Sequence, residues 1–233
     1  MTVSKTDTVI VVGFLILVQG TGALAGFWLP AIAPEVGQSL GLSPSLIAYP
    51  VLILYIFAMI SSLMAGGFVT RFGAWRSSQA ALILIGISHL MFMNGSLIFL
   101  MLGSIILGSA YGLLTPPASH LLSKIVTPKN RNLVFSIRFT GVPLGGILAG
   151  LLAPPIALEY GWRESMLVTI LISIVVATGM QPFRKKWDND RSKTSKIFRN
   201  PIADIKLVWK LTALKWVALS GLCMGAIQTT LTI

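Results

Sequence analysis

The stretch SSQAALILIGISHLMFMNGSLIFLMLGSIILGSAYGLLTPPASHLLS, from Ser77 to Ser123, contains no lysine, arginine, aspartate or glutamate. A helix needs only about 20 mostly apolar residues to cross the hydrocarbon core of a bilayer. The stretch is long enough for two crossings, and the turn signal NGS at 94–96 divides it. It therefore predicts two transmembrane helices, at 77–94 and 97–121.

Apolar runs of similar length lie on both sides of this stretch. We expect them to form membrane helices at 9–29, 46–69, 133–158, 165–182 and 216–233. The expected fold class is an all-α membrane protein. Its expected organisation is a six-helix bundle at 1–182, a basic loop at 183–212 and the opening of a second bundle at 213–233.

The overall composition agrees with a polytopic membrane protein. Apolar residues make up 55% of the chain and charged residues 11%, whereas a soluble domain carries about 25% charge. This excludes an ordinary cytosolic enzyme, a disordered tail and a nucleic-acid-binding module. The single cysteine, Cys223, excludes a disulfide framework and a cysteine-rich metal site. We expect no catalytic residues, no metal and no cofactor.

The net charge of +11 is unevenly distributed along the chain. The chain has 18 lysines and arginines, and all except Arg138 and Arg163 fall in the N-terminal segment and the two–three, four–five and six–seven connections. The positive-inside rule places this side in the cytoplasm. We therefore expect a multi-pass protein of the bacterial cytoplasmic (inner) membrane, with a cytoplasmic N-terminus. The lipid bilayer, and no nucleic acid, is the expected partner of the positive charge.

The six–seven connection allows two interpretations. Its apolar residues at 197–198 and 205–210 could form an amphipathic helix on the inner leaflet. The alternative is a solvated linker.

Arg138 is the one basic residue expected inside a membrane span. An intramembrane charge costs several kcal/mol and usually faces a cavity or a partner. One interpretation is that Arg138 extends to the inner headgroups or pairs with a loop. The other is that it presents a cation to an anionic substrate, in a cavity also lined by Gln19, Tyr111 and Thr115.

The expected fifth helix has an unusual glycine–proline sequence. Gly141, Pro143, Gly145 and Gly146 indicate either a hinge that lets this helix move or static close packing. No aspartate or glutamate falls well inside the six expected complete spans, so no acidic proton carrier is evident there. His89 and His120 are expected to have packing or helix-end roles.

The sequence GGFVTRFGAWR at 66–76 resembles the signature of the major facilitator superfamily, G-x-x-x-D-R-x-G-R-R/K-R/K, at the same place in the topology. The matching positions are Gly66, Arg71, Gly73 and Arg76. Thr70 replaces the acidic residue. We expect Gly66 to allow close approach of another helix, Gly73 to allow a tight turn, the arginines to anchor a gating loop, and Thr70 to act as a weak helix cap.

The sequences at 108–120 and 135–146 resemble the fourth and fifth helices of cyanate-permease-like facilitators. The resemblance implies the six-helix N-terminal half of a major facilitator fold plus the start of a seventh helix. Such carriers have two six-helix halves and work by alternating access. We therefore expect a fragment that lacks its C-terminal half, or, as the alternative, two copies that assemble one carrier.

The function expected from these features is secondary active transport of a small solute. Arg138 favours an organic or inorganic anion, and a coupling ion is a further expected partner. Two alternatives from other classes are a seven-helix receptor and an intramembrane enzyme. The enzyme would need clustered acids or a nucleophile–base pair, and the receptor would place the N-terminus and the six–seven loop on opposite faces.

Overall fold

The computed structural model describes residues 4–192, 194–195, 197, 206 and 208–232. The chain divides into two units, Met1–Ile197 and Phe198–Ile233, and each is described by itself. The described part of the second unit contains one long helix, α12 (Thr212–Thr232). The surface helix considered at 205–210 falls partly outside the described residues.

The first unit is built from helices joined by short connections, which confirms the expected all-α class. Its α-helices are α1 (Lys5–Ala31), α2 (Ala33–Leu40), α3 (Pro44–Phe72), α4 (Ala74–Phe92), α5 (Leu97–Gly112), α6 (Thr115–Ile125), α7 (Arg131–Phe139), α8 (Gly141–Tyr160), α9 (Trp162–Gly179) and α10 (Arg184–Trp187). Short 3₁₀ turns, η1 (Pro128–Asn130) and η2 (Gln181–Phe183), precede α7 and α10.

Five helical segments within the described residues are long and apolar enough to cross a membrane. They are Thr6–Ala31, Leu46–Phe72, Leu97–Ile125, Pro128–Tyr160 and Trp162–Trp187. The chain is therefore an integral, multi-pass membrane protein. The expected third span corresponds to α4, which is not among the five because polar side chains lower its hydropathy. These side chains are buried inside the bundle: Ser77, Ser78, Gln79, Ser88 and His89.

Two of the expected continuous helices are interrupted. The segment expected at 97–121 is divided into α5 and α6, and the segment expected at 133–158 is divided into α7 and α8. Pro116, Pro117 and Pro143 lie three or four residues after these interruptions begin. A proline has no N–H for the carbonyl four residues earlier, so each helix bends or breaks there.

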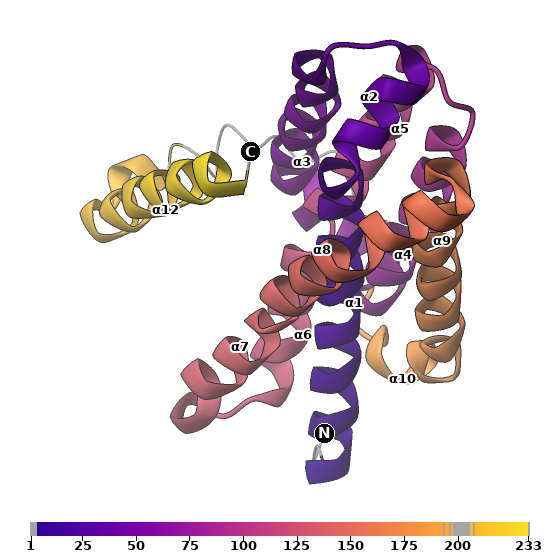
Figure 1. Ribbon diagram of the computed structural model, residues 1–233. Coiled ribbons are helices and arrows are strands. Elements are labelled where there is room, and N and C mark those ends of the chain that lie inside the picture. The colour runs from indigo at the N-terminus through magenta and orange to yellow at the C-terminus, as the bar shows by residue number, and fades with distance from the viewer. Residues whose placement is uncertain (1–3, 193, 196, 198–205, 207, 233) are drawn as a thin grey trace. The chain divides into compact units, whose positions relative to one another are not determined.

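The helices of the first unit pack in pairs through small residues. α8 packs along α1, α3 packs along α5, and α4 packs against both α5 and α9 (Figure 1). At Gly108 and Gly112 of α5, an added Cβ would collide with the backbone of α3. Close backbone approach of this kind drives helix association where lipid offers no hydrophobic gain.

Polar contacts bring the strongly basic connections together at one end of the first unit, here called the basic face. Lys186 contacts Asp7 at 2.6 Å between Nζ and Oδ1, and the Ser192 N–H donates to the Thr70 carbonyl at 2.9 Å. Asp190 pairs with Lys124 at the end of α6. The N-terminal, two–three, four–five and six–seven segments therefore share one end, as the sequence predicts.

Candidate functional site

Arg138 occupies the last turn of α7, and its side chain is 0% exposed. Its Nη2 donates to Gln19 Oε1 of α1 at 2.6 Å. The same nitrogen lies 3.4 Å from Thr115 Oγ1 and 3.5 Å from the Leu114 carbonyl oxygen. Three segments that are far apart in the sequence therefore meet at this guanidinium.

The two helix interruptions meet at the same guanidinium. Leu114 and Thr115 lie where α5 gives way to α6, and Arg138 lies three residues before Gly141, where α8 begins. Helix breaks in membrane proteins are tolerated where the segment is buried in protein or lines a cavity. The interruptions therefore mark this position as a candidate binding site.

Close packing between α1 and α8 brings Gln19 within reach of Arg138. A Cβ added at Gly141 would lie 2.7 Å from the Ile16 carbonyl oxygen and 3.2 Å from the Gln19 Cβ. One added at Gly145 would lie 2.8 Å from the Leu24 backbone nitrogen. Because these glycines lack side chains, the α1 backbone can approach α8 closely and present Gln19 to the guanidinium.

The charge of Arg138 is not neutralised by the described part of the chain. No described carboxylate forms an ion pair with it, and its Nε and Nη1 are buried without a described hydrogen-bond partner. The Phe139 ring lies 4.8 Å from its Cζ, a weak cation–π contact. Since the side chain is buried against α1 and α6, the structure does not show the extension to headgroups that the sequence allowed.

The other residues of the expected cavity and hinge have different surroundings. Tyr111 does not contact Arg138 among the described polar contacts; its ring lies 6.5 Å from the Tyr55 ring. Gly146 lies beside the Phe27 ring, where a Cβ would approach to 3.3 Å. Pro143 lies in the first turn of α8, just after the interruption.

The second candidate site is the turn that carries the signature sequence. Gly73 joins α3 to α4 with φ of +97°, a conformation that favours glycine, so the expected tight turn is confirmed. The expected cap at Thr70 is wrong: its Oγ1 donates to the Gly66 carbonyl one turn earlier, at 2.8 Å. Gly66 also differs from expectation, because an added Cβ would meet nothing within 4 Å in the described chain.

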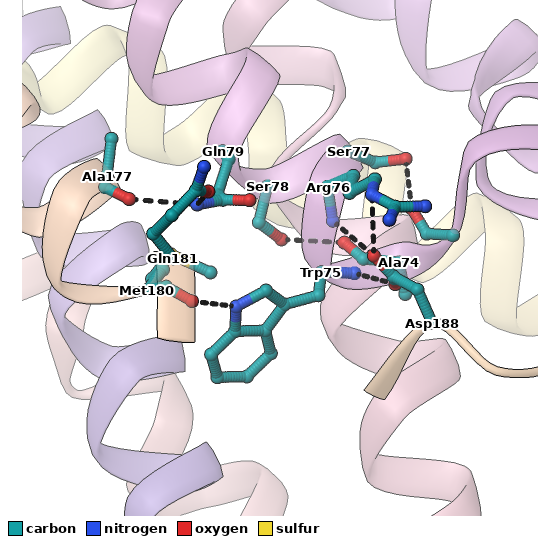
Figure 2. Close-up of polar contacts among 11 residues, drawn as sticks. Ala74, Trp75, Arg76, Ser77, Ser78, Gln79, Ala177, Met180, Gln181 and Asp188 are labelled. Atoms are coloured by element: carbon teal, nitrogen blue, oxygen red, sulfur yellow. Dashed lines mark hydrogen bonds and ion pairs between the residues drawn. The ribbon is translucent and has the colours of Figure 1, made fainter. Parts of the chain in front are cut away.

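Asp188 supplies the carboxylate that the signature sequence lacks (Figure 2). Its Oδ1 accepts from the Trp75 N–H at 2.8 Å, and its Oδ2 accepts from the Arg76 N–H at 3.1 Å. A carboxylate in this position caps the first turn of α4 and interacts favourably with the helix dipole. The Arg76 Nε lies 3.8 Å from Oδ2, which completes the contact.

Sequence reasoning missed Asp188, although a signal was present. Acidic residues are rare in the basic six–seven connection, and Asp188 and Asp190 interrupt it directly after Trp187. Burial raises the pKa of Asp188 to about 6, against the hydrogen bond from the Trp75 N–H. Burial also acts to raise the pKa of Asp190, but hydrogen bonds from Lys124 and His120 lower it overall.

Further contacts hold the signature turn to the end of α9 and to the connection beyond it. The Trp75 Nε1 donates to the Met180 carbonyl at 2.7 Å, and Gln79 Nε2 donates to the Ala177 carbonyl at 2.9 Å (Figure 2). Arg71 Nη1 donates to the Ser195 carbonyl at 3.0 Å. Both arginines of the turn therefore have partners in the six–seven connection, and their expected role in gating stays a prediction.

Comparison with known proteins gives one curated relative and several solved structures. The chain is 27% identical over 160 residues to a protein named gallate transporter from Pseudomonas putida, covering 66% of this chain and 34% of that protein. It matches a peptide transporter POT mutant bound to alafosfalin with a TM-score of 0.68 and 19% identity, covering 94% of this chain and 45% of that one.

A POT family transporter bound to 5-aminolevulinic acid matches with a TM-score of 0.66 and 14% identity, covering 95% of this chain and 47% of that one. At these identities the structures show the fold alone, and the chain spans less than half of each. The family model described as Major Facilitator Superfamily matches residues 14–233. The chain therefore belongs to the major facilitator superfamily.

Proposed function

We propose that the whole protein is a secondary active transporter of a small organic anion, and that Arg138 binds the anionic group of its substrate. The observation that carries this proposal is the buried, unneutralised guanidinium at the meeting point of two helix interruptions. A charge inside the membrane that lacks a protein partner normally serves a substrate or ion pathway. Transport by alternating access follows from the family.

The arrangement of donors around Arg138 suits a carboxylate. Gln19 accepts from one N–H of Nη2, which leaves Nε and Nη1 unpartnered, and either of them can form a bidentate pair with the second N–H of Nη2 on the two oxygens of a carboxylate. Thr115 is exposed and adds a hydroxyl beside the guanidinium. Gallate is itself a small carboxylate, so the name of the curated relative supports this solute class.

The remaining roles are also proposals. Tyr111 lines the cavity farther along α5, and Gly66, Arg71, Gly73 and Arg76 form the gating loop of the basic face. Gly141, Pro143, Gly145 and Gly146 let α8 move against α1. We place the basic face and the N-terminus in the cytoplasm of a bacterial inner membrane, on the positive-inside rule.

The proposed carrier is completed by a second six-helix half that supplies the rest of the cavity and the coupling-ion site. Within the superfamily, the helix-four and helix-five sequences favour the cyanate-permease-like subgroup. Family membership argues against the intramembrane enzyme and the seven-helix receptor.

Uptake of radiolabelled gallate, benzoate and cyanate by cells that express the full-length protein tests the proposal. Arg138→Ala should reduce uptake of an accepted anion by about 10- to 150-fold, because a charge-assisted bidentate contact contributes about 1.5–3 kcal/mol. Arg138→Lys should retain the positive charge but lose the bidentate geometry, so its uptake rate should fall between those of the unchanged protein and Arg138→Ala.

Arg131→Ala is the matched control, since Arg131 begins the same helix and is exposed. It should transport like the unchanged protein. Unchanged anion uptake by Arg138→Ala would disprove the anion site. A second measurement separates function from folding: Arg138→Met should keep or raise the melting temperature, because it removes a buried charge without an acidic partner.

A further inference from the structure

A second concentration of positive charge lies away from Arg138, on the basic face. A pocket of about 420 Å³ opens there between the start of α4 and the six–seven connection. Its lining residues are mostly cationic: Arg76, Arg184, Lys185, Asp188, Asn189 and Arg191. We call it the basic pocket.

The acidic residue of the basic pocket does not neutralise it. Asp188 is 1% exposed, and both of its oxygens accept backbone N–H groups of α4. Figure 2 shows this carboxylate against the first turn of α4, with the Arg76 side chain beside it. The pocket therefore presents four basic side chains to a ligand, and a single carboxylate that is already occupied.

The basic side chains retain donors for a ligand. Arg76 Nη1 is buried without a hydrogen-bond partner among the described residues. The side chains of Arg184, Lys185 and Arg191 form no ion pair or hydrogen bond with the described part of the chain, although the charge of Arg184 lowers the pKa of Asp188. Three guanidinium groups on one small pocket match the oxygen geometry of a phosphate, which accepts paired N–H donors.

The position of the basic pocket sets the level of the membrane at which it acts. Arg76 is in the first turn of α4, and Arg184 begins α10 just after the last turns of α9. Both therefore lie where membrane-embedded helices end, at the depth of lipid headgroups. Basic pockets between helix ends on the cytoplasmic side are suited to phosphate-bearing headgroups.

We propose that the basic pocket binds a phosphate group, carried either by an anionic phospholipid or by a free phosphate ester. Bound phosphate bridges Arg76 of α4 and the arginines of the six–seven connection. It thereby reinforces the attachment that Asp188 makes between the same two segments. The site is separate from Arg138 and does not depend on the transported solute.

Binding to the purified full chain in detergent tests the proposal. One arm titrates short-chain phosphatidylglycerol, a second titrates short-chain phosphatidylcholine, and a third titrates glycerol 3-phosphate; native mass spectrometry and thermal shift are the readouts. The variant R184A/R191A removes two pocket arginines. K129A/R131A is the charge-matched control, because both residues are exposed on the basic face and do not line the pocket.

Phosphatidylglycerol should bind the unchanged chain and the control more tightly than phosphatidylcholine does. R184A/R191A should weaken phosphatidylglycerol binding roughly thirtyfold, since each basic residue near an anionic lipid raises the affinity about fivefold and the variant removes two of them. R184K/R191K, which keeps the charge, should lose part of this affinity, and it serves as a control for a folding defect.

The three arms identify the ligand. If binding of phosphatidylglycerol depends on the two arginines, the ligand is a lipid headgroup. If only binding of glycerol 3-phosphate depends on them, the ligand is a free phosphate ester. Two outcomes would overturn the proposal: equal losses in R184A/R191A and K129A/R131A, or no preference for phosphatidylglycerol over zwitterionic phosphatidylcholine together with no binding of glycerol 3-phosphate.

Discussion

At the scale of single residues, the most informative comparison is between two buried charged side chains, one with hydrogen-bond partners for its charged atoms and one that lacks some of them. Arg138 is buried with two nitrogens unpartnered in the described chain. Asp188 is equally buried, but two backbone N–H groups and Arg76 satisfy it. A buried charge that has hydrogen-bond partners is accounted for by its structural contacts, whereas an unsatisfied one costs free energy and is retained for another reason. Asp188 is therefore explained by its role in the structure, whereas Arg138 indicates a functional role.

The raised pKa of Asp188 predicts a pH dependence of stability. Its folded pKa is about 6 and its ordinary value is 3.8. The folded state thus binds the extra proton, so the contribution of this group to stability is present below pH 3.8 and is lost as pH rises through about 6. Among the neighbouring charges, Asp190 raises the pKa of this carboxyl further, whereas Lys124 and Arg184 lower it.

Melting temperatures measured for the unchanged chain and for Asp188→Asn between about pH 4 and pH 8 check this prediction. Relative to Asp188→Asn, the melting temperature of the unchanged chain should fall as the pH rises through about 6. A difference that does not vary with pH would contradict the assignment to Asp188. Arg131→Ala serves as a control for general charge effects.

The two glycines of the signature should respond differently to alanine. Gly73→Ala forces a positive φ on a side chain and drives its Cβ into Asp188, so it should cost at least about 2 kcal/mol of stability. Gly66→Ala enters open space in a helix and should be neutral or slightly stabilising. Thermal unfolding in detergent compares them, and equal effects would refute this account of the turn.

At the scale of elements, the contact between α1 and α8 positions Gln19 beside Arg138. It depends on Gly141 and Gly145, where a Cβ would collide with the α1 backbone, whereas Gly150 on the same helix has open space. The proline-linked interruptions of α5–α6 and α7–α8 add the second requirement, because they place Thr115 beside the same guanidinium. Helix packing and helix breaking together therefore assemble the candidate site.

Gly145→Ala should separate α1 from α8 and destabilise the bundle by about 1–3 kcal/mol, as overpacking does in a close contact. It should also lower anion uptake, because Gln19 would move away from Arg138. Gly150→Ala is the matched control and should match or slightly exceed the unchanged chain in stability. The melting temperature and the uptake rate are the measurements, and equal behaviour of the two variants would exclude a close-packing role.

At the scale of the whole molecule, the basic segments meet at one end of the first unit. Gly95, which follows the other end of α4, lies against Arg163 in the first turn of α9. The membrane orientation proposed from charge therefore makes a direct prediction. In a Cys223→Ser background, a cysteine at Asn130 should react with an impermeant maleimide only after the cells are permeabilised. A cysteine at Asn94 should react in intact cells, and the reverse pattern would place the basic face outside.

Hydropathy and charge asymmetry sufficed to predict the class, most of the spans and the shared end of the basic connections. These are local properties, since the cost of placing a residue in lipid depends mainly on that residue. The same reasoning extended α5 and α7 too far, because it gave too little weight to prolines that follow an apolar run. It brought together Arg138, Gln19 and Thr115, which the structure shows in contact, whereas Tyr111 makes no described polar contact with Arg138 and its place in the cavity stays a prediction.

The sequence by itself determined that this chain crosses the membrane as helices, that the basic connections share one end of the helical bundle, and that an arginine lies within a span. Only the tertiary structure decided that Gln19 holds Arg138 across 119 residues and that Asp188 replaces the missing signature carboxylate across 113 residues. The physical reason is that burial in lipid is a sum over neighbouring residues, whereas a hydrogen bond depends on where helices distant in the sequence come together.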